Sequence, residues 1–110
     1  MVKPKKINNT RAFCLDKAIS YEKGAIVSKE LVKKEAGTVT LFSFDKGQAL
    51  SEHTAPFDAL LYIIDGEAKV RISKKSHTVK AGQMLIMPAN KPHSLSADSR
   101  FKMLLVLIKK

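Results

Sequence analysis

Apolar and polar residues alternate along much of the chain from about residue 26 onward, in short stretches separated by turn signals. The clearest alternation covers residues 67–73, where Ala68, Val70 and Ile72 are apolar and the residues between them are polar. A period of two predicts a β-strand with one face in water. Residues 38–44 are rich in β-branched and aromatic side chains, which also favour strands. Many short strands at this spacing indicate a β-sandwich or barrel.

Glycines and short polar runs divide these stretches. The Asp-Gly pair at residues 65–66 separates the apolar residues 60–64 from the alternating residues 67–73, which is a strong signal for a β-hairpin. Further turn signals occur at Gly37 and at residues 45–47, 74–76 and 81–82. No helical period persists, and only residues 16–21 favour a turn or two of helix. The sequence therefore predicts an all-β fold.

Three runs are apolar at every position instead of alternating: residues 60–64, 84–87 and 103–108. An antiparallel strand with one face in water should alternate, so these strands need a cover on both faces. In a chain of this size the second cover is either another subunit or the N-terminal segment. We expect a homodimer, because association of two copies hides the second apolar face.

The chain has 110 residues, of which 45% are hydrophobic and 27% charged, as in an ordinary globular domain. We expect an N-terminal arm or cap over residues 1–24 and one barrel domain over residues 25–110. No apolar run approaches the roughly 20 residues of a membrane helix, and no signal peptide is recognisable, so the expected location is cytoplasmic. The single cysteine, Cys14, excludes an internal disulfide framework and a four-cysteine zinc site.

The charge balance is strongly basic, with 20 Lys and Arg against 10 Asp and Glu and a net charge of +10. Such a balance raises the question of nucleic acid. The cations are mostly lysines spread along the chain, and only Arg11, Arg71 and Arg100 supply a guanidinium. Aromatic residues make up 6%, which leaves few surfaces for base stacking. Nucleic acid is therefore not an expected partner, whereas the charge predicts some affinity for small anions.

Two of the three histidines stand in similar surroundings. In residues 47–66 a glycine turn leads to His53, a proline and an apolar strand, and in residues 82–93 a glycine turn and an apolar strand lead to two prolines and His93. His77 has no such framing. An isolated histidine is more often structural than functional, so the shared framing singles out His53 and His93.

The first of these segments resembles the first motif of the cupin superfamily. That motif reads Gly, five residues, His-x-His, three or four residues, Glu, six residues and Gly. Gly47, His53 and Gly66 stand at the required spacing. Ala55 takes the place of the second histidine, and Ala59 takes the place of the glutamate.

The second segment resembles the second cupin motif, which reads Gly, five residues, Pro-x-Gly, two residues, His, three residues and Asn. Gly82, Pro88 and His93 match in register, while Asn90 replaces the glycine and Ala97 replaces the asparagine. The resemblance covers residues 36–108. It implies a double-stranded β-helix, a jelly-roll barrel with a pocket at one mouth.

In cupins the two histidines and the glutamate of the first motif and the histidine of the second hold a divalent metal. The resemblance therefore leaves His53 and His93 as candidate ligands of Zn, Ni, Mn or Fe. A catalytic metal site usually has three protein ligands, so no cofactor is expected. Asp58, in a loop, and His77 stay open as further ligands.

With two ligands replaced by alanine, the predicted pocket has apolar walls and two convergent imidazoles, which is typical of a small-ligand site. Phe57 would act as a lid at the mouth. Leu and Met side chains can also fill such a barrel without leaving a cavity. The candidate ligand-binding residues are His53, Ala55, Phe57, Ala59, Leu61, Leu85, Met87, His93 and Leu95.

Three functions stay open. The first is a dimeric protein that binds a small molecule, with anions as one candidate class, in a metal-poor pocket. The second is a metal-dependent enzyme of the isomerase, decarboxylase or dioxygenase type that uses His53 and His93. The third is a scaffold whose apolar outer strands serve association. The missing histidine and glutamate favour the first over the second, and no Ser-His-carboxylate set suggests catalysis without a metal, so no catalytic residue is assigned.

Overall fold

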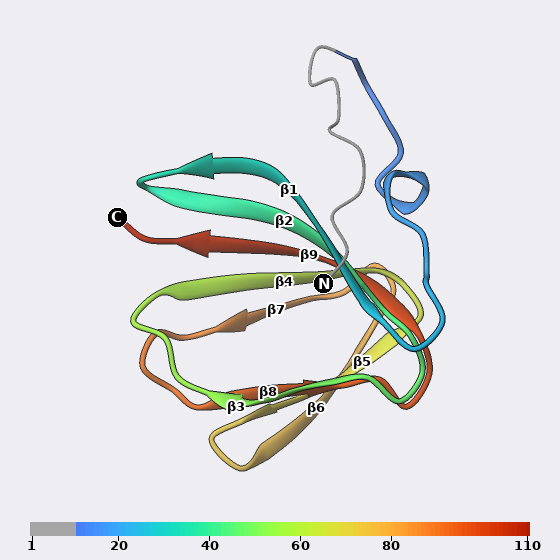
Figure 1. Ribbon diagram of the computed structural model, residues 1–110. Coiled ribbons are helices and arrows are strands. Elements are labelled where there is room, and N and C mark those ends of the chain that lie inside the picture. The colour runs from blue at the N-terminus through green and yellow to red at the C-terminus, as the bar shows by residue number, and fades with distance from the viewer. Residues whose placement is uncertain (1–10) are drawn as a thin grey trace.

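In the computed structural model, which describes residues 11–110, nine antiparallel strands form two sheets that lie face to face (Figure 1). The strands are β1 (Ile26–Lys34), β2 (Gly37–Phe44), β3 (Ala49–His53), β4 (Asp58–Asp65), β5 (Glu67–Ile72), β6 (Lys75–Lys80), β7 (Met84–Met87), β8 (His93–Ser96) and β9 (Phe101–Ile108). One sheet has five strands in the order β1-β2-β9-β4-β7, and the other has four in the order β3-β8-β5-β6. The predicted all-β fold is confirmed.

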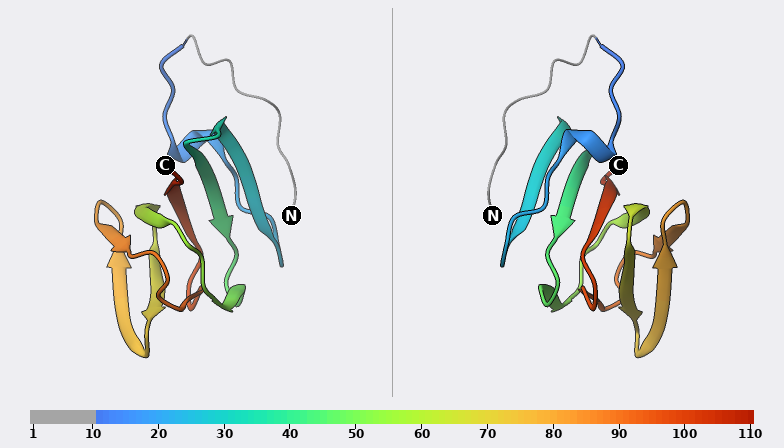
Figure 2. Two further views of the ribbon diagram at one scale, coloured as in Figure 1. Left: turned by 90° about the vertical axis from the view of Figure 1, so that its left-hand side faces the viewer. Right: turned by 90° about the vertical axis from the view of Figure 1, so that its right-hand side faces the viewer.

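The three runs that are apolar at every position become neighbours in one sheet. They lie in β9, β4 and β7, which are adjacent in the five-stranded sheet. The alternating stretch becomes β5, in the middle of the four-stranded sheet. The two views of Figure 2 show the sheets edge-on as two layers.

The space between the sheets holds the main core. Every second residue of each strand points into it, as a period of two requires. Phe44 and Phe101 stack with their ring centroids 4.5 Å apart. Leu61 and Ile63 of β4 and Val70 of β5 are enclosed in the same cluster. The inner faces of both sheets thus share one apolar core.

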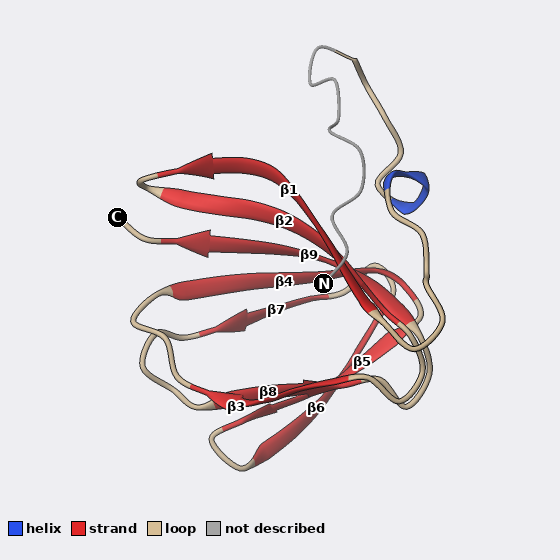
Figure 3. Cartoon of the chain, in the orientation of Figure 1, coloured by secondary structure: helices blue, strands red, loops and turns tan. Residues whose placement is uncertain are grey.

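We call residues 11–25 the strap, because its residues 15–21 pack on the outer face of the five-stranded sheet. The strap contains one turn of 3-10 helix, η1 (Asp16–Ala18) (Figure 3). Its Ile19 is buried together with Val27 of β1 and Leu41 of β2 in a second, smaller apolar cluster. The strap thus covers its own chain. Residues 1–10 of the predicted arm lie outside the described residues, and within 11–110 no helix has the length and apolarity to cross a membrane.

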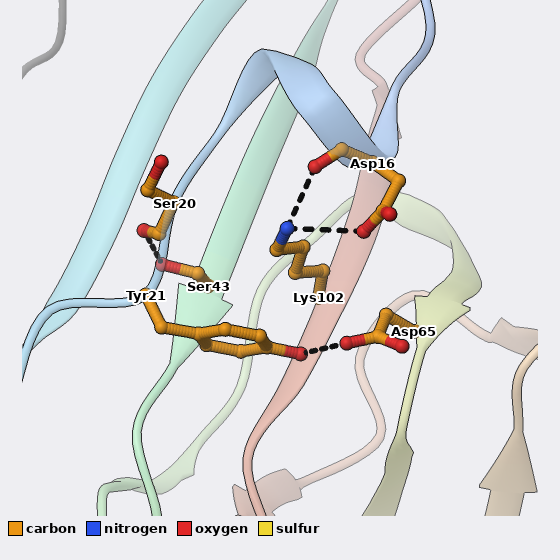
Figure 4. Close-up of polar contacts among 6 residues, drawn as sticks. All are labelled: Asp16, Ser20, Tyr21, Ser43, Asp65 and Lys102. Atoms are coloured by element: carbon orange, nitrogen blue, oxygen red, sulfur yellow. Dashed lines mark hydrogen bonds and ion pairs between the residues drawn. The ribbon is translucent and has the colours of Figure 1, made fainter.

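Polar contacts also fix the strap to the sheet (Figure 4). The Lys102 ammonium donates to the backbone oxygen of Asp16 at 2.6 Å and to its carboxylate at 3.0 Å. The Tyr21 hydroxyl donates to Asp65 at 2.5 Å. The Ser43 hydroxyl donates to a backbone oxygen of the strap at 2.9 Å. Lys102 is buried, so its partner in the strap compensates a charge that would otherwise be costly.

Candidate functional site

His53 and His93 meet at one end of the four-stranded sheet. His53 is the last residue of β3, His93 is the first residue of β8, and the two are paired across the strands. Their ring centroids lie 4.3 Å apart at an interplanar angle of 68°, an edge-to-face contact. His93 is buried, with 7% of its surface exposed, whereas His53 is exposed. The two framed histidines therefore form one pair with a buried and an exposed member.

Each ring is oriented by the backbone in the same way. The Nδ1 of His53 lies 3.0 Å from the carbonyl oxygen of Ser51, and the Nδ1 of His93 lies 3.1 Å from the carbonyl oxygen of Lys91. A carbonyl oxygen only accepts, so each Nδ1 must carry the hydrogen. In a neutral ring the lone pair is then on Nε2. Both rings can accept a proton, a ligand hydrogen bond or a metal ion at Nε2.

Two loops beside the pair are tied together. The backbone N–H of Asn90, in the loop between β7 and β8, donates to the carbonyl oxygen of Ala55 at 2.8 Å. Asn90 has a φ of 65°, in the left-handed region. Asparagine tolerates that conformation better than most residues with a side chain. This is why Asn90 can stand where the second motif has glycine, and the turn that leads to His93 is kept.

The two further ligands left open by the sequence do not complete a metal site. The Asp58 carboxylate accepts the N–H of Ala89 at 2.8 Å, so it braces the neighbouring loop. His77 lies on β6 opposite Val70, two strands away from β8. Within residues 11–110 no three His, Cys, Asp or Glu side chains are grouped to hold a metal ion. The pair therefore stands without the third ligand that a catalytic metal usually has.

The apolar candidates lie between the sheets, from the barrel's middle to its rim. Ala59, Leu61, Met87 and Leu95 belong to the main core, and the half-buried Leu85 packs against it. Leu61 is completely enclosed, Ala59, Met87 and Leu95 are 3% exposed, and Ala55 and Phe57 at the rim are half-buried. Exposure thus increases toward the end where the histidines lie. That these side chains line a ligand pocket stays a prediction.

Cations stand near this rim that sequence reasoning had not singled out. The Lys109 ammonium lies 5.6 Å from the ring centroid of Phe57. Lys91 is the residue whose carbonyl orients His93. Figure 1 shows the C-terminal end of β9 at the same end of the barrel as the β3–β4 and β7–β8 loops. From the sequence, Lys109 could be placed at the end of an apolar strand, because it directly follows residues 103–108. Its contact with Phe57 could not be predicted.

Comparison with known proteins identifies the fold. Residues 40–108 match the model of the Cupin domain family. A conserved protein of unknown function from Streptococcus pyogenes is 34% identical, with 100% of this chain and 96% of that chain covered and a TM-score of 0.91. The resemblance read from the two motifs is thus confirmed over nearly the same residues, and with it the double-stranded β-helix.

Two further solved structures show the same barrel. A cupin superfamily protein from Desulfitobacterium hafniense is 27% identical over 96% of this chain and 97% of that chain, with a TM-score of 0.89. A Cupin 2 conserved barrel domain protein from Leptotrichia buccalis is 45% identical over 88% of this chain, with a TM-score of 0.86. The match spans 47% of that second chain, about half of its length. No curated protein matches the sequence.

Proposed function

The chain belongs to the cupin superfamily, and we propose that it binds a small molecule at the end of the barrel where His53 and His93 meet. The observation that carries the proposal is the imidazole pair itself. Two rings at 4.3 Å, each held by a backbone carbonyl at Nδ1, present two preoriented Nε2 atoms at the rim of an apolar core. Apolar walls with a few convergent polar groups are the usual form of a small-ligand site.

An anionic ligand fits the charges around the pair. A protonated imidazole donates through Nε2–H, so the pair can hold a carboxylate or phosphate oxygen between two donors. Lys91 and Lys109 lie on the segments that surround the histidines. The net charge of +10 also raises the concentration of anions near the protein. We propose a small organic acid with an apolar body as the ligand class.

The alternative is a metal-dependent cupin enzyme. One observation favours it: an imidazole whose Nδ1–H is held by a backbone carbonyl is oriented as a metal ligand usually is. The donor set argues against it, because Ala55 and Ala59 have no donor atoms and residues 11–110 provide no group of three ligands. The residues present therefore do not fit a catalytic metal, and we propose no reaction.

The proposed partner for the chain itself is a second copy. That association is independent of the ligand, because it rests on the outer face of the five-stranded sheet and not on the histidine pair. The cytoplasmic location expected from the sequence stays a prediction.

The ligand proposal is tested by NMR of the histidine rings during separate titrations with acetate, benzoate, succinate and inorganic phosphate. At least one anion should shift the ring signals of His53 and His93 with saturation and leave those of His77 unchanged. The response should vanish in the His53→Ala/His93→Ala double variant and persist in His77→Ala, the matched control. No response to any of the four anions, or a response that survives in the double variant, contradicts the proposal.

Elemental analysis of protein purified without an affinity tag separates the two candidate functions. We expect transition metal well below one ion per chain, in equal amounts in the wild type and in the His53→Ala/His93→Ala variant. About one ion per chain in the wild type that is lost in the variant would replace the binding function with the metal-dependent alternative.

A further inference from the structure

Lys109 is held in a defined position at the end of the barrel where the histidine pair lies (Figure 1). Its backbone N–H donates to the carbonyl oxygen of Ala36, in the turn between β1 and β2, at 2.7 Å. The next residue, Lys110, is bound to the same turn, because its N–H donates to Ala36 at 3.2 Å and its ammonium pairs with Glu35 at 3.2 Å. Residues 109–110 therefore stay attached to the five-stranded sheet beyond the end of β9.

The side chain of Lys109 lies on the inner face of this sheet. In β9, Leu105 and Leu107 pack against the main core, and Lys109 follows at the same alternation. In β4, Phe57 precedes the buried Ala59 at the same alternation. The pairing of β4 with β9 places Phe57 opposite Lys109, and the ammonium lies 5.6 Å from the ring centroid. The alternation and the cation–π contact thus agree on the direction of this ammonium.

The histidine pair lies on the inner face of the opposite sheet. His93 is paired with Ile72 of β5, which packs against the main core, and His53 is paired with His93. Residues paired across antiparallel strands point to the same face. The loops that follow β3 and β7 connect the two sheets at this end of the barrel. One sheet therefore presents a cation, and the other presents two imidazoles, to the same end of the space between them.

The separation of these groups suits a short ligand with an acidic group at each end. Sheets that pack face to face lie about 10 Å apart. The lysine and histidine side chains extend from opposite sheets, so a shorter distance is left between their polar atoms. Half-buried apolar side chains, Phe57 and Leu107 among them, stand beside Lys109. One carboxylate satisfies the histidines or the lysine, whereas two carboxylates joined by a few methylene groups satisfy both.

Two other lysines near the histidines are placed less favourably. Lys75 stands in the same row of the four-stranded sheet as His93, but Ile72 lies between them. Lys91 is exposed in the loop between β7 and β8, and the atom that it directs at His93 is its carbonyl oxygen. Lys109 differs from both, because a backbone hydrogen bond and an aromatic ring hold it at the end of the barrel.

We propose that Lys109 is a specificity-determining residue of the ligand site and that the ligand is a small aliphatic dicarboxylate. One carboxylate accepts hydrogen bonds from the protonated histidine pair, and the other pairs with the Lys109 ammonium. Phe57 is a positioning residue, because its ring attracts the ammonium. This inference rests on the proposed binding of organic acids at the histidine pair and adds a second point of attachment.

NMR titrations of the histidine rings with two matched pairs of acids test the inference. Succinate is compared with butyrate and glutarate with valerate, so that the acids of each pair have equal chain length and differ in the second carboxylate. We expect the wild type to bind at least one dicarboxylate about tenfold more tightly than its monocarboxylate. Lys109→Met should remove this preference and leave the affinity for the monocarboxylate unchanged. All titrations use the same pH and salt concentration, because salt screens charges.

Lys110→Met is the matched control, because it removes the same charge from the neighbouring residue, whose ammonium pairs with Glu35. It should keep the preference for the dicarboxylate. Both lysines are exposed, so both variants should keep their fold, which circular dichroism verifies. A wild type without the preference, a Lys109→Met variant that retains it, or an equal loss in the two variants would overturn the inference.

The monocarboxylates judge the proposed function separately. If butyrate or valerate binds to the wild type and not to the His53→Ala/His93→Ala variant, the ligand site stands, whatever the effect of Lys109→Met. If none of the four acids shifts the rings of His53 and His93, the proposed binding of acids fails and the role of Lys109 fails with it.

Discussion

In both sheets every second residue of a strand points outward, but these outward residues are polar or charged on one sheet and apolar on the other. On the four-stranded sheet, Lys69 and Arg71 of β5 point outward, and the Lys69 ammonium donates to the Thr78 hydroxyl at 2.9 Å. On the five-stranded sheet, Leu60 of β4 and Ile86 of β7 occupy the equivalent outward positions. One outer face is suited to water and the other requires a cover.

This difference is already visible in the chain as two kinds of strand. A strand with one wet face alternates, as β5 does, and a strand that needs two covers contains a continuous apolar run, as β4 does over residues 60–64 and β9 over residues 103–108. The structure shows that the strap covers only part of this face. The strap covers the half of the face around Leu41, and the proposed second copy covers the half around Ile86.

The two outer faces should differ most in the effect of a substitution where the strap covers the sheet. Leu41 is 0% exposed although it lies on an outer face. Leu41→Ala should lower the free energy of unfolding by about 2–5 kcal/mol, because it leaves a cavity beneath the strap. Urea unfolding measures this difference. Thr78→Ala, on the outer face of the other sheet, is the control and should stay within about 0.5 kcal/mol of the wild type. Equal effects of the two variants would mean that the faces do not differ.

A smaller effect is expected at the polar contacts of the strap. Tyr21→Phe removes the hydrogen bond to Asp65 and should cost about 1 kcal/mol in urea unfolding. Tyr62→Phe is the matched control on the open half, since residues 11–110 provide no hydrogen-bond partner for the Tyr62 hydroxyl, and its effect should be smaller. A loss in Tyr62→Phe that equals the loss in Tyr21→Phe would contradict this account of the strap.

The hydrogen bond between Tyr21 and Asp65 can also be tested by titration of the Tyr21 phenol at alkaline pH. Partial burial raises the pKa of Tyr21 above its ordinary value of 10.0, and the hydrogen bond to Asp65 raises it further. A raised pKa favours the neutral phenol in the folded chain, so this contribution to stability is complete below pH 10 and is lost as the pH rises beyond it. In Tyr62→Phe, which leaves Tyr21 as the one tyrosine, tyrosinate absorbance should develop at higher pH in the folded protein than in urea. Coincident titration curves would refute the shift.

Much of the fold could be predicted from the sequence because period and spacing are local properties. The Asp-Gly pair at residues 65–66 does separate β4 from β5, but the predicted β-hairpin is wrong, because β4 belongs to the five-stranded sheet and β5 to the four-stranded sheet. The three continuous apolar runs were correctly predicted as strands. The resemblance to the two cupin motifs implied that His53 and His93 converge on one pocket. The structure confirms that the two rings are in contact.

Other features depend on contacts between distant residues and could not be predicted in this way. The pairing of Tyr21 with Asp65 and of Asp16 with Lys102 joins segments that no periodicity relates. In the sequence, only the presence of Lys102 inside the otherwise apolar strand β9 indicated that a polar residue packs against this strand. The turn expected at residues 74–76 does follow β5, but the structure places it at Ser73 and Lys74, which both have positive φ although neither is a glycine.

The most direct test of the central claim is solvent paramagnetic relaxation measured by NMR on both outer faces of the wild type in solution. A soluble paramagnetic agent broadens signals of atoms that water reaches. The account predicts strong broadening of the Thr78 methyl on the four-stranded sheet and protection of the Ile86 and Leu60 methyls on the five-stranded sheet, although Ile86 is 59% exposed in the single chain. Equal broadening of the methyls on both faces would contradict the claim that the apolar face is covered.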